Sequence, residues 1–235
     1  DVATAKAIQT LKNNGYEPFI ATGRSSAETR DIMESANIHS GIFMNGQVVL
    51  YQGKLVYSSE IPTETVKKFH QMVKEDGYGF TAYNEKEFYL VESTDGAKDA
   101  YGFIHTNPPA LNADFYIDNP INMLLFICLP PAEEKYKEAF PNLDFLRNTP
   151  YSVDVISKGN SKAEGIKRFL EYLNQEDAET YAFGDGPNDI EMLQAVTHPV
   201  AMGNAIPVLK EIAEFITTNN TDNGIINGLK HYGLI

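Results

Sequence analysis

A short loop from Gly184 to Asp189 carries two aspartates, an asparagine and two glycines between two stretches of regular structure. The apolar residues 181–183 are typical of a buried strand, and the apolar residues after the loop return at a mainly helical spacing. In an open α/β sheet, such a strand-to-helix loop lies at the carboxyl edge, where ligands bind. The carboxylates of Asp185 and Asp189 suit a hard cation such as Mg2+, which uses one or two protein carboxylates and keeps most of its waters. The alternative interpretation is an acidic turn that caps a helix.

The composition is typical of a globular protein with one large domain, or with a core and a second module. The chain has 235 residues, of which 43% are hydrophobic, and this is enough for a packed core. Its formal net charge of −13 argues against nucleic acid or an anionic membrane as a partner, because cationic surfaces bind both. No apolar run approaches the ~18 residues of a membrane span, and the start does not resemble a signal peptide. The expected location is therefore cytoplasmic.

Strands and helices alternate in both terminal parts of the chain. In the first part, the patterns predict a helix ending at Gly15, a strand over 16–21, a helix over 25–36 and a hairpin turn at Asn45-Gly46. In the last part, they predict helices over 162–173 and 222–231 and a strand over 199–202. This alternation is typical of an α/β fold with a doubly wound parallel sheet.

The middle of the chain has a different pattern. A helix ending at Gly77 is followed by strands over 78–91, and a polar, proline-rich passage over 92–120 interrupts the order. A strand over 123–129 contains the single cysteine, Cys128, which is interpreted as a buried structural thiol. These patterns predict an inserted α+β domain over 62–153, within a core domain formed by residues 1–61 and 154–235.

The central strand of a doubly wound sheet should come early in the chain, yet no strand precedes the helix that starts near Asp1. An empty central position would expose unpaired backbone groups and the apolar faces of two neighbouring strands. A strand and the loop after it are therefore expected before Asp1 in the whole protein.

Several short motifs together resemble the haloacid dehalogenase-like hydrolases. They are Ala21-Thr22-Gly23-Arg24, Asn45-Gly46, Lys158 to Lys162, Gly184 to Asp189 and Ala201-Met202-Gly203-Asn204-Ala205. The resemblance is to the Cof-type sugar-phosphatase branch, and it covers nearly the whole chain. It implies a Rossmann-like core with an α/β cap inserted between the second and third motifs.

The resemblance also implies how the phosphate is bound. Thr22 would donate its hydroxyl to a phosphate oxygen, although a threonine in this place could equally cap a helix. Lys162 would neutralise the phosphate and the attacking carboxylate. The alternatives are that Lys162 is a solvated lysine at a helix start, or that Lys158 has this role.

In the same way, Asp185 would be the direct Mg2+ ligand, with Asp189 reaching the metal through a bound water and Asn188 lying near the phosphate. Asp189 could instead provide favourable charge in the first turn of a helix. Gly23, Arg24 and the Asn45-Gly46 turn would face the cap and contact the substrate, although for Asn45-Gly46 a plain hairpin turn explains the residues equally well.

The first motif of the family is an Asp-x-Asp-Gly-type loop that supplies the nucleophile and the general acid. The given sequence has no such loop ahead of the first predicted helix. The expected function is a Mg2+-dependent phosphomonoester hydrolase for a sugar phosphate or a similar small phosphorylated metabolite, acting through an aspartyl-phosphate intermediate. Its attacking aspartate would precede Asp1. Two alternatives stay open: a non-catalytic phosphate- and metal-binding relative, and a phosphomutase or phosphotransferase on the same scaffold. The oligomeric state is also open.

Overall fold

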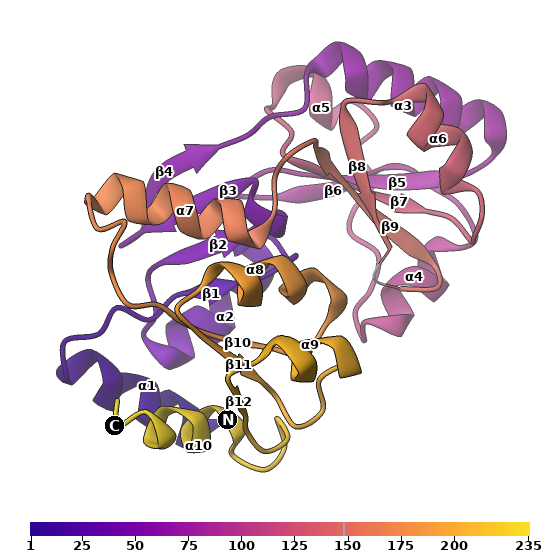
Figure 1. Ribbon diagram of the computed structural model, residues 1–235. Helices are drawn as coiled ribbons and strands as arrows, with labels where there is room; N and C mark the ends of the chain where they lie inside the picture. Colours follow the sequence, from indigo (N-terminus) through magenta and orange to yellow (C-terminus); the bar gives the residue numbers. More distant parts are fainter. Residues whose placement is uncertain (148) are drawn as a thin grey trace. The chain divides into compact units, whose positions relative to one another are not determined.

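The computed structural model of the protein describes residues 1–147 and 149–235, which form two compact units (Figure 1). The core unit contains residues 1–22, 28–57 and 161–235, and the cap unit contains residues 23–27 and 58–160. Asn148, inside the predicted insertion, lies outside the described residues. The domain limits expected from the sequence, 61/62 and 153/154, stay predictions.

The elements of the core unit alternate along the chain. The helices are α1 (Val2–Asn13), α2 (Ser26–Ala36), α7 (Lys162–Leu173), α8 (Ile190–Ala195), α9 (Pro207–Ile212) and α10 (Gly224–His231). The strands are β1 (Ile20–Ala21), β2 (Gly41–Phe43), β3 (Val48–Tyr51), β4 (Lys54–Ser58), β10 (Tyr181–Gly184), β11 (His198–Ala201) and β12 (Phe215–Ile216). Two 3-10 turns, η1 (Met44–Gly46) and η2 (Pro187–Asp189), follow β2 and β10.

The core strands form two sheets. One has the order β1-β2-β3-β4, with β1 parallel to β2 and β3 antiparallel to it, and the other is the parallel sheet β10-β11-β12. Among the described residues, β1 pairs only with β2 and β10 only with β11, so each has one edge without a partner strand. The parallel pairs joined by helices confirm the predicted α/β class.

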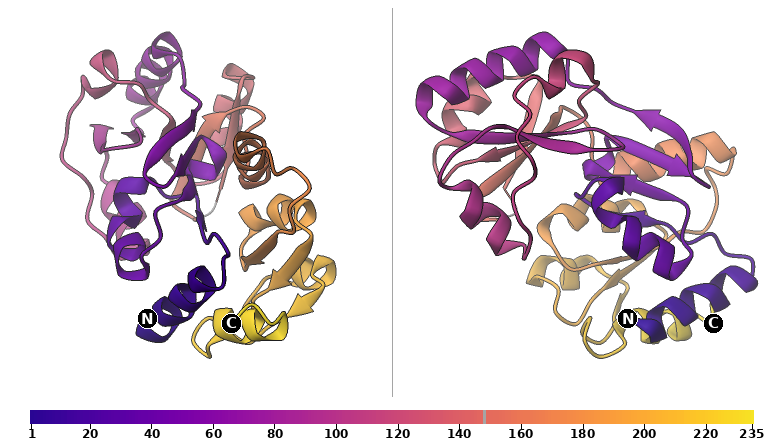
Figure 2. Two further views of the ribbon diagram at one scale, coloured as in Figure 1. Left: turned by 90° about the vertical axis from the view of Figure 1, so that its left-hand side faces the viewer. Right: turned by 180° about the vertical axis from the view of Figure 1, so that it is seen from behind.

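Alternation along β10 explains why helices cover both faces of its sheet. Ala182 packs into a cluster with residues of α7 and α8, such as Phe169 and Met192. Its neighbours Tyr181 and Phe183 pack against α1 and α10, which lie side by side in both views of Figure 2, and Phe183 also contacts the cluster of Leu193 and Leu209. Because successive side chains of a strand point to opposite faces, one short apolar run supplies two separate clusters.

The cap unit is built on a five-stranded antiparallel sheet. The strands are β5 (Gly79–Tyr83), β6 (Phe88–Glu92), β7 (Met123–Ile127), β8 (Leu143–Leu146) and β9 (Ser152–Ser157), in the order β6-β5-β7-β9-β8. The helices are α3 (Thr63–Asp76), α4 (Ala97–Phe103), α5 (Phe115–Asp118) and α6 (Glu133–Ala139). Figures 1 and 2 show α3, α5 and α6 on one face of this sheet and α4 on the other.

The predicted interruption over 92–120 is wrong in part, because α4 and α5 lie there. Both helices are too short to show a periodic pattern or to be stable alone, and they depend on burial against the sheet. Ala97, Ala100 and Tyr101 of α4 pack with Leu90 and Ile127, and the hydroxyl of Tyr101 lies 2.6 Å from that of Thr81. The strand expected over 16–21 is also shorter than predicted, since only Ile20 and Ala21 pair with β2.

A bidentate ion pair joins α6 to the chain after β8. The guanidinium of Arg147 donates to both carboxylate oxygens of Glu133, at 2.6 and 2.7 Å, and to the carbonyl of Cys128 at 3.2 Å. The hydrogen bond from Arg147 holds the pKa of Glu133 below its ordinary value of 4.5. The buried thiol of Cys128 has its pKa raised to about 11 by desolvation, which agrees with its interpretation as a structural residue.

Replacing Glu133 by glutamine is expected to lower the free energy of unfolding by about 2 kcal/mol at pH 7, because Arg147 loses its ionic partner. A carboxyl group with a lowered pKa stabilises the fold above its unfolded-state pKa, and this stabilisation is lost as the pH falls through the folded-state pKa. The difference between the two proteins should therefore shrink as the pH falls below 4.5 and disappear only below the lowered folded-state pKa of Glu133. Urea unfolding at pH 7 and at acidic pH measures this, with the exposed neighbour Glu134→Gln as the control. A difference that persists in acid would contradict the assignment.

Asparagines fasten to the cap sheet the two chain crossings that flank residues 58–160. The amide of the buried Asn122, directly before β7, donates to the hydroxyl of Ser58 at 2.9 Å and to the carbonyl of Ser59 at 2.7 Å. The amide of Asn160 donates to the carbonyl of Ser157 at 2.9 Å and to the hydroxyl of Ser59 at 3.4 Å. Both crossings are thus held at the same end of the cap sheet.

Among the described residues, no helix has the length and apolar character needed to cross a membrane.

Candidate active site

The loop after β10 is closed by the carboxylate of Asp189. Its Oδ2 accepts hydrogen bonds from the backbone amides of Asp185 at 2.9 Å and Gly186 at 3.0 Å. Gly184 allows this tight turn, because a Cβ there would lie 2.7 Å from the Cβ of Asp189 and from a methyl group of Leu193. The loop is therefore held in one shape from within.

The other oxygen of Asp189 binds a lysine from a distant part of the sequence. The ammonium of Lys162, the first residue of α7, lies 2.6 Å from Oδ1 of Asp189, and both residues are buried, at 6% and 5% exposure. The helix start is fixed by Ser161, whose hydroxyl accepts from the amide of Glu164 at 3.3 Å. Lys158, by contrast, is exposed and donates to the carbonyl of Pro141 in the cap unit. Of the two lysines, only Lys162 meets the acidic loop.

Asp185 is exposed and has one carboxylate oxygen available. Its Oδ2 accepts from the amide of Asn204 at 2.9 Å, whereas no described residue donates to its Oδ1. Asn204 is itself held, because its Oδ1 accepts from the backbone amide of Asn220 at 2.9 Å. Sequence reasoning did not assign Asn204 a role, although it lies in the motif that runs from Ala201 to Ala205.

The Asn45-Gly46 turn meets the acidic loop through two asparagines. The amide of Asn188 donates to Oδ1 of Asn45 at 3.1 Å, and the backbone amide of Asn45 donates to the carbonyl of Thr22 at 3.1 Å. The predicted hairpin is confirmed, because β2 and β3 pair antiparallel on either side of η1. The turn also does more than reverse the chain, since Asn45 is 1% exposed and reaches the loop after β10.

These contacts bring most of the predicted site residues together in the core unit. Thr22 with Asn45, Asn45 with Asn188, and Lys162 with Asp189 are in direct contact, and Asp185 lies in the same loop as Asp189. Gly23 and Arg24 belong to the segment 23–27 of the cap unit, where the hydroxyl of Ser26 donates to the carbonyl of Glu85.

Gly46 sets the spacing between this turn and the start of α7. Its φ is +92°, and a Cβ there would lie 2.0 Å from the carbonyl oxygen of Ser161. The backbone carbonyl of Gly46 also accepts from Arg168 at 3.4 Å. The turn that carries Asn45 and the helix that carries Lys162 are therefore in backbone contact.

Replacing Gly46 by alanine is expected to lower the free energy of unfolding by about 3 kcal/mol or more, because the new methyl group meets backbone that cannot move alone. Gly53 is the matched control, with a φ of +75° and nothing within 4 Å of its Cβ position. Gly53→Ala should cost only the conformational strain, about 1 kcal/mol. Urea unfolding compares the two variants, and equal losses would show that the close approach to Ser161 is unimportant.

The donor set fits Mg2+. A divalent magnesium ion takes one or two carboxylates and completes its shell with water and substrate oxygens. Asp185 offers an available carboxylate oxygen at an exposed loop. This set suits an ion that is shared with a bound substrate.

Comparison with known proteins identifies the family. Residues 1–229 match the family model described as haloacid dehalogenase-like hydrolase. The chain is a haloacid dehalogenase-like hydrolase. This hydrolase is 36% identical over 234 residues to YkrA of Bacillus subtilis (strain 168), which is described as a candidate phosphatase, and the match covers 99% of this chain and 91% of YkrA.

Two solved structures resemble the hydrolase over its whole length. A hypothetical protein from Geobacillus kaustophilus HTA426 is 31% identical with a TM-score of 0.93, and the match covers 100% of this chain and 92% of the other. BT4131, described as a sugar phosphatase of HAD subclass IIB, is 27% identical with a TM-score of 0.85 and the same coverage of 100% and 92%. These relatives confirm that the hydrolase belongs to the Cof branch.

Proposed function

We propose that the protein is a Mg2+-dependent phosphomonoester hydrolase that acts on a sugar phosphate or a similar small phosphorylated metabolite. The observation that carries the proposal is the carboxylate of Asp189, which binds the buried ammonium of Lys162 through one oxygen and the backbone amide of Asp185 through the other. Asp185 in the same loop has a carboxylate oxygen available. A phosphate ester needs positive charge on its oxygens during transfer, and these residues provide both a cation and a metal ligand. Relatives named as phosphatases support the same reaction.

The residues of this chain would bind and orient the phosphate. Thr22 would donate its hydroxyl to a phosphate oxygen, and the ammonium of Lys162 would neutralise the phosphate charge while it stays paired with Asp189. The Asn188 amide, held beside Asn45, would lie next to the phosphate. Gly23, Arg24, Asn45 and Gly46 would contact the rest of the substrate.

The metal would be held by Asp185, with Asp189 reaching it through a bound water. Bound Mg2+ would supply positive charge beside the phosphate oxygens and the attacking group. Asn204 would keep the Asp185 carboxylate oriented, because its amide occupies the oxygen that the ion does not use.

The attacking group would be an aspartate. Its carboxylate would form a bond to phosphorus as the bond from phosphorus to the ester oxygen breaks, and a neighbouring aspartic acid would give its proton to the departing alkoxide. Water would then attack the acyl phosphate, releasing inorganic phosphate and restoring the carboxylate.

Removal and return of the metal tests the proposal directly. Phosphate release by the whole protein is measured on a panel of sugar phosphates and p-nitrophenyl phosphate, with Mg2+, with EDTA, and after Mg2+ is restored. Release with Mg2+, a loss of about a hundredfold or more with EDTA, and recovery afterwards are expected. Absence of release from every ester would favour a non-catalytic relative. Phosphate transferred to an added sugar acceptor, in place of free phosphate, would favour a phosphotransferase.

A further inference from the structure

The cap unit contains a pocket of about 700 Å3 at one end of its sheet. Gly79 of β5 and Ile127 of β7 pair at this end, whereas the chain crossings leave the sheet near Met123, at the other end of β7. Strand β7 has five residues, so the pocket lies roughly 13 Å along the sheet from the crossings. The residues that line it all fall between 76 and 151, so none of them belongs to the candidate active site.

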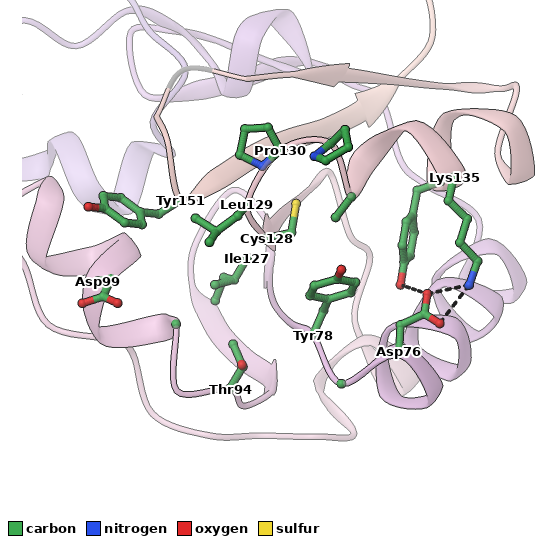
Figure 3. A pocket seen from close by; sticks show the side chains of 15 residues that line it. Asp76, Tyr78, Thr94, Asp99, Ile127, Cys128, Leu129, Pro130, Lys135 and Tyr151 are labelled. Atoms are coloured by element: carbon green, nitrogen blue, oxygen red, sulfur yellow. Dashed lines mark hydrogen bonds and ion pairs between the residues drawn. The ribbon is translucent and has the colours of Figure 1, made fainter.

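The walls of the pocket are mostly apolar and aromatic. Figure 3 shows Tyr78 and Tyr151 on either side of a floor formed by Ile127 and Cys128. Leu129, which also lines the pocket, is 60% exposed. No described residue forms a hydrogen bond with the hydroxyl of either tyrosine. The volume falls within the range of about 300–1,000 Å3 that is typical of small-molecule sites.

The pocket has one carboxylate whose charge is not compensated. On one side, both oxygens of Asp76 bind the ammonium of Lys135 at 2.8 Å, and Oδ2 also accepts from the hydroxyl of Tyr136 at 3.0 Å. The positive charge of Lys135 is thus neutralised by Asp76. On the opposite side in Figure 3, Asp99 projects from the first turn of α4, and within residues 1–147 and 149–235 it has neither an ion pair nor a hydrogen-bond donor to its side chain.

We propose that this pocket binds a small organic cation, a protonated amine carried on an apolar ring or short alkyl chain. The ammonium group would pair with Asp99, and the apolar body would lie between Tyr78 and Tyr151. Ammonium groups are attracted both to carboxylates and to the faces of aromatic rings. An anion is disfavoured, because the only lysine of the pocket is neutralised by Asp76. This inference is independent of the proposed phosphatase function.

Calorimetric titration of the whole protein tests the proposal with two matched pairs of probes. The cations 2-phenylethylammonium and n-hexylammonium are compared with the alcohols 2-phenylethanol and 1-hexanol, which have the same bodies without the charge. At least one cation should bind about fivefold more tightly than its alcohol. Failure of both cations to bind at concentrations up to about 10 mM, or equal binding of cations and alcohols, would overturn the proposal.

Two variants locate the binding in this pocket. Asp99→Asn should remove the preference for the cation, whereas Asp95→Asn, the same change at an exposed residue that does not line the pocket, should keep it. Gly96→Leu should weaken binding about tenfold or more by filling the pocket, because a Cβ at Gly96 would lie in ordinary contact, 3.6 Å, with Ile127. Gly102→Leu is its control on the open side of α4, with nothing within 4 Å. Circular dichroism checks that each variant is folded, and unchanged binding by the folded Asp99 and Gly96 variants would place the cation elsewhere.

Discussion

Asp185→Asn is expected to lower kcat for Mg2+-dependent phosphate release by about a thousandfold. Asparagine keeps the shape of the side chain and the oxygen that faces Asn204, but it removes the negative charge that would hold the metal. Asp185 is exposed, so the free energy of unfolding should change by no more than about 0.5 kcal/mol. Initial rates over a series of Mg2+ concentrations, together with urea unfolding of the same samples, measure both quantities.

Asp177→Asn is the matched control for this change. Asp177 is an exposed acid in the turn before β10, and its replacement alters the net charge equally without touching the loop after β10. Its kcat should equal that of the parent. A fully active Asp185→Asn variant would remove Asp185 from the proposed mechanism, and a variant that unfolds would show instead that its contact with Asn204 is structural.

Lys162→Met is expected to affect both stability and activity. Its removal leaves Oδ1 of the buried Asp189 without its ionic partner, and breaking a buried ion pair in this way costs about 3–5 kcal/mol. Because the proposed role of Lys162 is to neutralise the phosphate, kcat should also fall by about a hundredfold or more. Lys167→Met is the control, since Lys167 is an exposed lysine of the same helix.

A double variant separates the two effects of Lys162. In Lys162→Met with Asp189→Asn, no charge is left buried alone, and the asparagine oxygen can still accept from the amides of Asp185 and Gly186. The double variant should therefore regain about half of the lost stability, or more, and its kcat should stay below that of Asp189→Asn alone, which is the reference because Asp189 also has a proposed role at the metal. If activity returns together with stability, Lys162 acts only by holding the acidic loop.

The candidate site could be predicted in its parts but not in its contacts. The helix predicted over 162–173 has the same limits as α7 in the structure. Its apolar residues repeat along one face, and Ser161 caps its start. Sequence spacing leaves Lys158 and Lys162 as alternatives, since one lies just before the helix and the other begins it. Only the fold separates them, through a contact between residues 27 positions apart.

Two features have no local signal at all. The contact of Asn204 with Asp185 depends on how two strand ends lie beside each other, and asparagine is common in loops simply because it tolerates turn conformations. Helix α4 contains Gly102 and has seven residues, so its own sequence does not favour a helix. It forms because Ala97, Ala100 and Tyr101 fill a space beside the cap sheet, which is a property of the whole unit.

The asparagines at the chain crossings bear on how the cap segment could be exchanged by gene recombination. Ser59 and Asn160 are 101 positions apart in the sequence but are joined by one hydrogen bond, and Asn122 holds the first crossing to the same sheet. A gene recombination event at these two points would transfer the complete five-stranded sheet and its buried aromatic cluster in one piece. The segment from 58 to 160 therefore carries the complete cap sheet between two neighbouring points of the chain, and only residues 23–27 of the cap unit lie outside it.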